Sequence, residues 1–400
     1  MADGRKWHIG RSHRTKAKSL LAVYPYNNPT TTPSLMALLG VLARDFPHID
    51  IFCRTSDCQV ECSTKGIRLL HSPRSIWNPL GHIEGYAWLR RLVTVVRNLW
   101  LWWRSPTILL GIDPEGLVYL SGINRLARCP LIYLSFELMI SDELSAQERL
   151  LKSREIKISQ QCPLVIIQDE ERAGILRQEN GLRKDYLALL PNAPLPSAIV
   201  KSDYLHEKFG LTSDTKIVLY AGNLAPWSGR DLFEELVSYW PERFVLVINS
   251  RTPVSGIMHK YLSKLQSSGR MYFTSAPTTD EDMVQLIAAA DFGLAPYRPV
   301  PDGWGSYGNM EHIGLSSGKV GYYAMCGLPI LASALPAYCR AFREYQAGGT
   351  YSRLAESGEV LAALDDNYHF HVAESRRWYE EVLNPSRSLD MIQERIRHFG

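Results

Sequence analysis

The segment GLSSGK, from Gly314 to Lys319, combines residue types that bind phosphate. Ser316 and Ser317 offer hydroxyl groups. Gly318 gives a flexible backbone, and Lys319 carries a positive charge. We expect a helix to begin here, and the free N–H groups and the dipole of a helix start favour a bound phosphate. The spacing differs from the G-x4-G-K-[ST] pattern, so the segment is not a P-loop. A serine-capped helix start without a ligand is the alternative interpretation.

Further candidates follow the predicted strands of the second half of the chain. In open α/β sheets, ligands bind outside the carboxyl ends of the strands, so residues at these positions are candidates for a binding site. These residues are Gly222, Asn223, Arg251 and Tyr297.

Acidic side chains follow two predicted strands of the first half. Glu137 comes after PLIYLSF, and we expect its carboxylate to orient hydroxyl groups of a substrate. A helix cap or an ion pair is the alternative for this residue. Asp113 and Glu115 in GIDPEG either line the same site or form the turn that begins a helix. His312, just before the GLSSGK segment, either contacts a ligand or is structural.

Strand and helix patterns alternate along both halves of the chain. The apolar runs SLLAVYPY, HIDIFC, GIRLLHS, PTILLGID, PLIYLSFEL and CPLVIIQD predict strands of the first half. The runs TKIVLYAG, RFVLVINS, GRMYFTS, FGLAPY and LPILAS predict strands of the second half, with helical patterns such as SGKVGYYAMCG between them. This alternation predicts an α/β fold of two doubly wound, Rossmann-like domains.

A proline-rich stretch, LLPNAPLPSA, predicts the connection between the domains. We expect a basic N-terminal arm over residues 1–18, a first domain over 19–198, a second domain over 199–375 and a C-terminal helical segment over 376–400. Because the carboxyl ends of two facing sheets form a cleft, we expect the reaction site between the domains.

Several blocks of the sequence resemble the GT-B glycosyltransferases, in the retaining group called family 4. In the second half these blocks are KIVLYAGNLAPWSGRDLFEEL, AAADFGLAPY and SSGKVGYYAMCGLPILAS. In the first half they are TILLGIDPEGL, PLIYLSFEL and IIQDEERAGIL. The resemblance implies GT-B architecture, with the acceptor on the first domain and a nucleotide-sugar donor on the second. It also implies a front-face reaction with retention, in which the leaving phosphate helps to deprotonate the acceptor. Lys319 and the neighbouring amides would then stabilise that phosphate.

The chain departs from the family pattern at the expected diphosphate contacts. The family commonly has basic residues at the positions of Asn223 and Ser228. Arg230 or Arg251 is our candidate to replace them.

Two more departures concern the ribose and the reacting sugar. Tyr322 stands where the family has a glutamate that grips the donor ribose, and Glu311 lies upstream at a different spacing. Phe136 stands where the family has a histidine near the reacting sugar, although Glu137 matches the acid that follows it. A divergent enzyme and a lost activity both fit these departures.

Composition and charge exclude several classes of protein. The 400 residues are 46% hydrophobic and 21% charged, which is typical of a globular protein and excludes disorder, collagen and coiled coil. The net charge of +3 is too small to indicate a nucleic-acid partner. Neither half has a G-x-G-x-x-G pattern after its first strand, which argues against a dehydrogenase. The spacing of Cys53, Cys58 and Cys62 fits no familiar metal site, and no convincing D-x-D motif follows a strand, so we expect no metal and no cofactor.

One helical stretch has the composition of a membrane-interface helix. Residues 88–104 interleave arginines with tryptophans, and the basic N-terminal arm adds positive charge. The alternative is a helix that covers a sheet. Neither a signal peptide nor an apolar segment long enough to span a bilayer is evident, so we predict a cytoplasmic protein. The sequence also allows this protein to bind the inner face of an anionic membrane.

The leading hypothesis is a nucleotide-sugar-dependent glycosyltransferase, acting on a glycan, a lipid-linked glycan or another glycoconjugate in polysaccharide biosynthesis. A GT-B sugar-nucleotide epimerase is one alternative. A degenerate, non-catalytic glycosyltransferase that acts as a partner subunit is the other.

Overall fold

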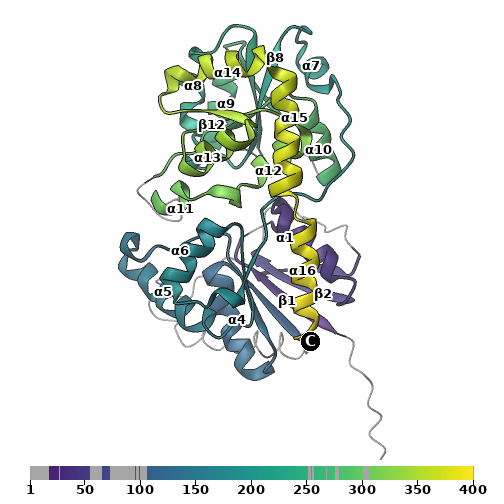
Figure 1. Cartoon of the computed structure of the whole chain (residues 1–400), viewed down its shortest axis with the longest axis vertical. Coiled ribbons are helices and arrows are strands. Elements are labelled where there is room, and N and C mark those ends of the chain that lie inside the picture. Colours follow the sequence, from purple (N-terminus) through teal and green to yellow (C-terminus); the bar gives the residue numbers. More distant parts are fainter. Residues whose placement is uncertain are drawn as a thin grey trace, which may run out of the picture.

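Two parallel sheets, one in each half of the chain, form the framework of the protein (Figure 1). The computed structural model describes residues 18–26, 28–54, 65–72, 106–250, 256–266, 268–274, 279–300 and 307–399, together with positions 95, 99 and 254. Within these residues the two sheets contain seven and six strands. The predicted α/β fold with two doubly wound domains is confirmed.

The first sheet has the strand order β3-β2-β1-β4-β5-β6-β7. Its strands are β1 (Ser19–Tyr24), β2 (His48–Arg54), β3 (Ile67–Ser72), β4 (Ile108–Ile112), β5 (Leu131–Leu134), β6 (Val165–Ile167) and β7 (Leu187–Leu189). The helices of this half are α1 (Pro33–Leu42), α4 (Asp113–Ala127), α5 (Ala146–Ser159) and α6 (Glu170–Asn180). No apolar run predicts β7, which has only three residues, all half-buried, and ends at the first residue of the proline-rich connection.

Alternate side chains of the central strand β1 enter apolar cores on opposite faces of this sheet. Leu20 and Ala22 pack in the core that includes α1, whereas Leu21 and Val23 pack in the core that includes α4. Helix α4 approaches β1 closely, because a Cβ atom on Gly116 would lie 2.5 Å from the Val23 carbonyl oxygen. Only glycine fits this contact, which sets the position of the α4 start next to the end of β1.

The second sheet has the strand order β10-β9-β8-β11-β12-β13. Its strands are β8 (Lys216–Gly222), β9 (Phe244–Ser250), β10 (Met271–Thr274), β11 (Phe292–Ala295), β12 (Ile330–Ser333) and β13 (Gly348–Tyr351). Its helices are α7 (Tyr204–Phe209), α8 (Phe233–Ser238), α9 (Gly256–Gln266), α10 (Asp280–Ala288), α11 (Tyr307–Glu311), α12 (Gly318–Cys326), α13 (Pro336–Tyr345), α14 (Ser357–Asp366) and α15 (Tyr368–Trp378). Every strand of this sheet except β13 lies in a predicted run.

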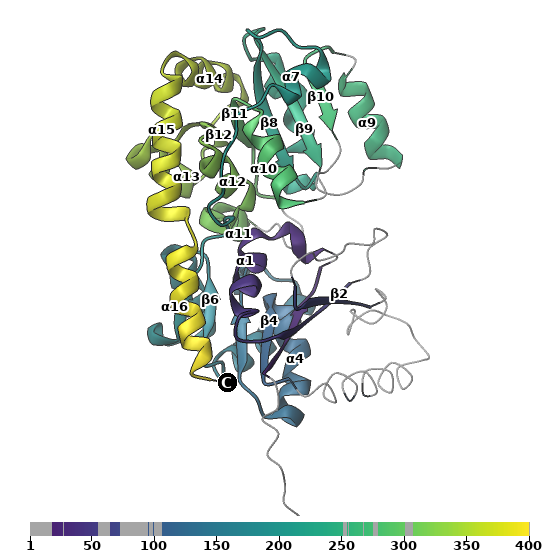
Figure 2. The ribbon, with the colours of Figure 1, turned by 90° about the vertical axis from the view of Figure 1, so that its right-hand side faces the viewer.

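The C-terminal part of the chain returns to the first domain. Helix α15 lies on the second domain, and after a short π-helical turn at Tyr379–Leu383 the helix α16 (Ser386–Arg397) lies on the first domain (Figures 1 and 2). The buried residues Leu389 and Ile392 belong to the same apolar core as α1. The Tyr379 hydroxyl donates to the backbone oxygen of Pro194, at 2.9 Å, so the two connections between the domains contact each other.

Candidate functional site

The two domains meet at the carboxyl ends of their sheets. The start of α12 lies against the start of α1, because a Cβ atom on Gly318 would lie 3.1 Å from Cδ of Pro33. The Ser316 hydroxyl donates to the backbone oxygen of Phe136, just after β5, at 3.3 Å. The Asn192 side chain, in the connection between the domains, donates to the backbone oxygen of Ser316 at 2.8 Å. The segment 316–318 that the sequence selects therefore lies at the domain junction.

Lys319 lies in the first turn of α12 and is 8% exposed. Its Nζ atom lies 4.0 Å from the ring centre of Tyr220 and 4.5 Å from that of Tyr297. The faces of aromatic rings attract a cation, most strongly where water is excluded, so the two tyrosines stabilise a charged ammonium group at this position. The structure thus holds a buried positive charge at the start of a helix.

Three other residues named from the sequence lie around this lysine. A Cβ atom on Gly222 would lie 3.0 Å from the Lys319 Cε, so a glycine at the end of β8 leaves room for the lysine. The Tyr297 hydroxyl and the Ser317 hydroxyl are 2.6 Å apart and hydrogen-bonded. Ser317 is the N-cap residue of α12, but its side chain bonds to Tyr297 and makes no cap hydrogen bond. Tyr220 is not predicted from the sequence, because an aromatic residue inside a buried strand is indistinguishable from an ordinary core residue.

The positions that depart from the family pattern have other contacts. Asn223 is exposed, and its backbone oxygen accepts a hydrogen bond from the Tyr220 hydroxyl. Ser228 is fully buried and donates to the backbone oxygen of Ala225 at 2.6 Å. The Arg230 guanidinium donates to the backbone oxygen of Leu224, and so holds the loop after β8. A donor contact from Asn223 or Arg230 stays a prediction.

Tyr322 lies one turn of α12 beyond Lys319. Its side chain is 1% exposed and belongs to the apolar core of the second domain. A contact between Tyr322 and a donor stays a prediction. Arg251 lies outside the described residues, as does the 88–104 stretch apart from the exposed helical positions Val95 and Leu99.

On the first domain, Asp113 organises the loop that follows β5. Its carboxylate accepts hydrogen bonds from the backbone N–H groups of Phe136, at 2.6 Å, and Glu137, at 2.9 Å. The Tyr26 hydroxyl donates to the other carboxylate oxygen at 2.9 Å. Burial and the nearby Glu137 carboxylate raise the pKa of Asp113 well above its ordinary value. Asp113 also begins α4, with a φ of 54°, so the helix start that the sequence predicts is confirmed, and a role for Asp113 in a binding site stays a prediction.

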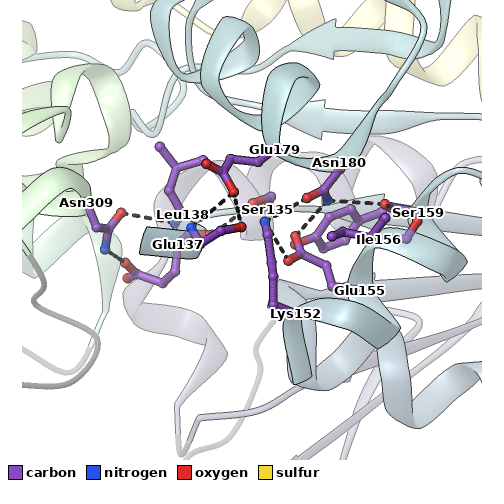
Figure 3. A network of polar contacts seen from close by, with 12 residues as sticks. Ser135, Glu137, Leu138, Lys152, Glu155, Ile156, Ser159, Glu179, Asn180 and Asn309 are labelled. Atoms are coloured by element: carbon purple, nitrogen blue, oxygen red, sulfur yellow. Dashed lines mark hydrogen bonds and ion pairs between the residues drawn. The ribbon is translucent and has the colours of Figure 1, made fainter. Parts of the chain in front are cut away.

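Glu137 contacts the second domain through Asn309 (Figure 3). The Asn309 side chain donates to the Glu137 carboxylate, and its oxygen accepts the Leu138 N–H at 3.0 Å. Burial raises the pKa of Glu137, whereas the Asn309 amide and the Arg172 guanidinium oppose that rise. Burial also raises the pKa of Glu115, in the first turn of α4, to about 7. The carboxyl end of the first sheet therefore holds acidic groups whose ionisation is shifted toward neutral pH.

Arg172 is a second junction residue that no sequence pattern predicts. It is 1% exposed, and its guanidinium donates to the Phe136 backbone oxygen, at 2.5 Å, and to the His312 backbone oxygen, at 2.7 Å. Burial lowers its pKa, and the charge of Glu137 opposes that shift. In the sequence, EERAGIL is typical of a solvated helix face. The burial of Arg172 at the junction becomes evident only when the second domain packs against this helix.

His312 contributes to the same junction. Its Nδ1 atom lies 2.7 Å from a carboxylate oxygen of Glu171 on α6. The Glu171 carboxylate also binds Arg340 of α13. The His312 ring is therefore paired with a side chain of the other domain, and a ligand contact stays a prediction.

A buried ionic network lies beside the β5 strand (Figure 3). Lys152 and Glu155 of α5 form an ion pair of 3.1 Å, with side chains 3% and 0% exposed. Asn180 at the end of α6 bonds to both, and the Tyr133 hydroxyl of β5 donates to Glu155 at 2.8 Å. The network joins α5, α6 and β5, and so gives the loop that carries Glu137 a fixed support.

Within the described ranges, no group of three or more His, Cys, Asp and Glu side chains is arranged to hold a metal ion. Across the part of the chain that the structure describes, no helix has the length and apolar character needed to cross a bilayer.

Solved structures with the same architecture extend these observations. No protein-family model matches the chain, and no curated protein matches it in sequence. The sucrose-phosphate synthase of Thermosynechococcus elongatus is similar in structure with a TM-score of 0.70, at 14% identity over 95% of this chain and 98% of that one. HepE of Anabaena, solved with UDP and glucose, has a TM-score of 0.67, at 14% identity over 95% of this chain and 100% of that one. WaaG, a glycosyltransferase of lipopolysaccharide biosynthesis, has a TM-score of 0.63, at 16% identity over 93% and 99% of the two chains. The chain therefore has the GT-B fold.

Proposed function

We propose that this chain is a glycosyltransferase that moves a sugar from a nucleotide-sugar donor to a glycan, a lipid-linked glycan or another glycoconjugate. The observation that carries the proposal is the buried Lys319 at the start of α12, at the junction where the carboxyl ends of both sheets meet. A fixed positive charge at a helix start suits the phosphates that leave when a sugar is transferred.

The donor is proposed to bind the second domain through its diphosphate. The α12 start offers the positive end of the helix dipole, the Ser317 hydroxyl and the Lys319 ammonium. Structures of HepE contain UDP and UDP-glucose, which makes UDP-sugars the first donors to test. The base, the sugar and the linkage are left to that test.

The proposed reaction breaks the bond between the anomeric carbon and the β-phosphate oxygen, and the electron pair of that bond stays on the phosphate. The acceptor oxygen bonds to the same carbon on the same face, with retention. The acceptor proton passes to the leaving phosphate, so the products are a glycoside and a nucleoside diphosphate. Glu137 is proposed to orient hydroxyl groups of the donor or the acceptor, and Lys319 to stabilise the phosphate.

A donor-turnover assay tests this function. The protein is incubated with UDP-, GDP- and ADP-sugars, with and without glycan or lipid-linked acceptors, and nucleotides and sugars are quantified by chromatography. A transferase releases nucleoside diphosphate, and the acceptor accelerates the release. Interconversion of the donor sugar without release would indicate the epimerase. No turnover and no binding of any donor would indicate a non-catalytic partner subunit. The departures from the family pattern at Asn223, Ser228 and Tyr322 favour that alternative.

The reaction is expected to need no metal ion. The reason lies in the sequence, which has no convincing D-x-D motif after a strand to hold a metal on the diphosphate. Turnover should therefore continue in EDTA. Loss of turnover in EDTA, with recovery in Mn2+ or Mg2+, would contradict this expectation.

We also propose contact with an anionic membrane through residues 88–104 and the basic N-terminal arm, which places a cytoplasmic protein at the inner face of a membrane. Arginines beside tryptophans favour a lipid interface, and Val95 and Leu99 within the stretch are exposed. The protein should co-sediment with vesicles that contain anionic lipid at low salt, and much less at high salt or with neutral vesicles. Failure to co-sediment with anionic vesicles at low salt refutes this contact.

A further inference from the structure

Asn309 is a side chain of the second domain that completes the surroundings of Glu137 in the first. Its amide N–H group donates to the Glu137 carboxylate, and its oxygen accepts the N–H of Leu138, the next residue, at 3.0 Å. Asn309 is 1% exposed, so these hydrogen bonds are shielded from water. A hydrogen bond to a charged group is stronger in such surroundings than at the surface.

The segment that carries Asn309 is docked on the first domain by several contacts. The Gly308 N–H, one residue earlier, donates to the Glu143 carboxylate at 3.0 Å. The Leu315 N–H donates to Asp169 at 3.1 Å. The Arg172 guanidinium lies 3.3 Å from the Asn309 oxygen. Because these partners all belong to the first domain, the bond from Asn309 to Glu137 forms only when the two domains are together.

The charges around Glu137 explain why a neutral donor from the other domain matters. Burial raises the pKa of Glu137 and so disfavours its ionised form. The Glu137 charge, added to burial, raises the pKa of Asp113 and Glu115 of α4. Arg172 of α6 favours the ionised form, but its guanidinium is shared among several acceptors. The Asn309 N–H group adds a hydrogen bond that favours the ionised carboxylate and fixes its direction.

We propose that Asn309 is a positioning residue, which holds the Glu137 carboxylate ionised and oriented only when the two domains are together. The proposal rests on the proposed function, because it assigns Glu137 a role in the transfer reaction. It makes completion of the reaction site depend on contact between the domains.

Two variants of Asn309 and one control test the proposal. Asn309→Asp keeps the oxygen that accepts from Leu138 but removes the N–H donor and places a second carboxylate beside Glu137. Asn309→Ala removes both bonds. Glu143→Ala is the matched control, because it breaks a neighbouring contact between the domains without touching Glu137.

We expect both Asn309 variants to lower kcat by about 10- to 100-fold while the Kd for UDP changes by less than about twofold. The pH profile of kcat should also change. The limb of the profile that reflects ionisation of Glu137 should shift to higher pH in both variants, and the shift should be larger in Asn309→Asp than in Asn309→Ala. Glu143→Ala should leave the profile in place. An unmoved profile in both Asn309 variants, or the same shift in the control, overturns the proposal.

A readout without turnover separates this inference from the proposed function. Side-chain carboxyl carbons of 13C-labelled glutamate are titrated by NMR, and the Glu137 signal is identified by its loss in Glu137→Gln. The titration midpoint of Glu137 should rise in both Asn309 variants and stay in place in Glu143→Ala. An unchanged midpoint refutes the role of Asn309 even if the wild-type protein transfers sugar. A raised midpoint in a protein that turns over no donor supports the contact and refutes only the function.

Discussion

The Lys319→Met protein is expected to bind UDP roughly 30- to 150-fold more weakly than the wild type. Methionine keeps the length and volume of the side chain between the Tyr220 and Tyr297 rings but removes the charge. Loss of a charged hydrogen bond to phosphate costs about 2 to 3 kcal/mol, which sets the size of the change in Kd. Isothermal titration of UDP into both proteins measures it.

A lysine elsewhere in the second domain provides the control for this variant. Lys201 is also in the second domain, and its ammonium group donates to the backbone oxygen of Ala290 at 2.7 Å. Its charge lowers the pKa of the Cys326 thiol, which lies at the opposite end of α12 from Lys319. Lys201→Met should bind UDP as the wild type does. If the wild type and Lys319→Met bound UDP with equal affinity, the UDP phosphates would not bind at the α12 start.

The Glu137→Gln protein is expected to turn over donor at least about 100-fold more slowly, with the Kd for UDP unchanged. Glutamine keeps the shape of the side chain but removes the charge and one acceptor. A positioned acidic or basic side chain in a reaction site typically accelerates turnover by about 100-fold or more. Steady-state turnover with titration of UDP separates the two quantities. Glu179→Gln, which changes a half-buried carboxylate bound to Ser141, should leave both unchanged.

The pH dependence of turnover gives a second check on Glu137. Burial raises the pKa of its carboxyl, so protonation persists to higher pH than for an exposed glutamate. If the ionised form is active, turnover rises with pH through a midpoint higher than that of an exposed glutamate, and this limb is absent in Glu137→Gln. A rate profile in Glu137→Gln identical in size and shape to that of the wild type would exclude the residue from the reaction.

Much of the fold follows from local patterns in the sequence. Apolar runs separated by helical patterns identify β1 to β6 and β8 to β12, because buried parallel strands are nearly continuous in apolar residues. The strands β7 and β13 are short, and their residues are mostly half-buried, so no such run marks them. Their pairing depends on the neighbouring strand, which a local pattern does not contain.

The candidate site is predicted in part. Gly222, Tyr297, Ser317 and Lys319 lie together in the structure because each follows a strand or begins a helix at the same edge of the second sheet. That edge follows from topology, so the sequence is sufficient to select these residues.

The junction between the domains is the part that sequence patterns do not reveal. Asn309 and Arg172 are far apart in the chain, and each has its role only because the other domain lies against it. Asp113 is ambiguous in the sequence for a related reason, since its carboxylate serves the loop at Phe136, more than twenty residues later. Contacts of this kind depend on how whole domains dock, and neither periodicity nor capping signals encode that.

The most direct test of the account is the thermal stability of the wild-type protein with UDP, GDP, ADP, CMP and NAD, repeated with Lys319→Ala. A ligand at about 100 times its Kd should add about 2.7 kcal/mol to the free energy of unfolding. We predict that one nucleoside diphosphate stabilises the wild type and that Lys319→Ala loses this stabilisation. No stabilisation by any of these nucleotides would contradict the assignment of a donor site and would favour the non-catalytic partner subunit.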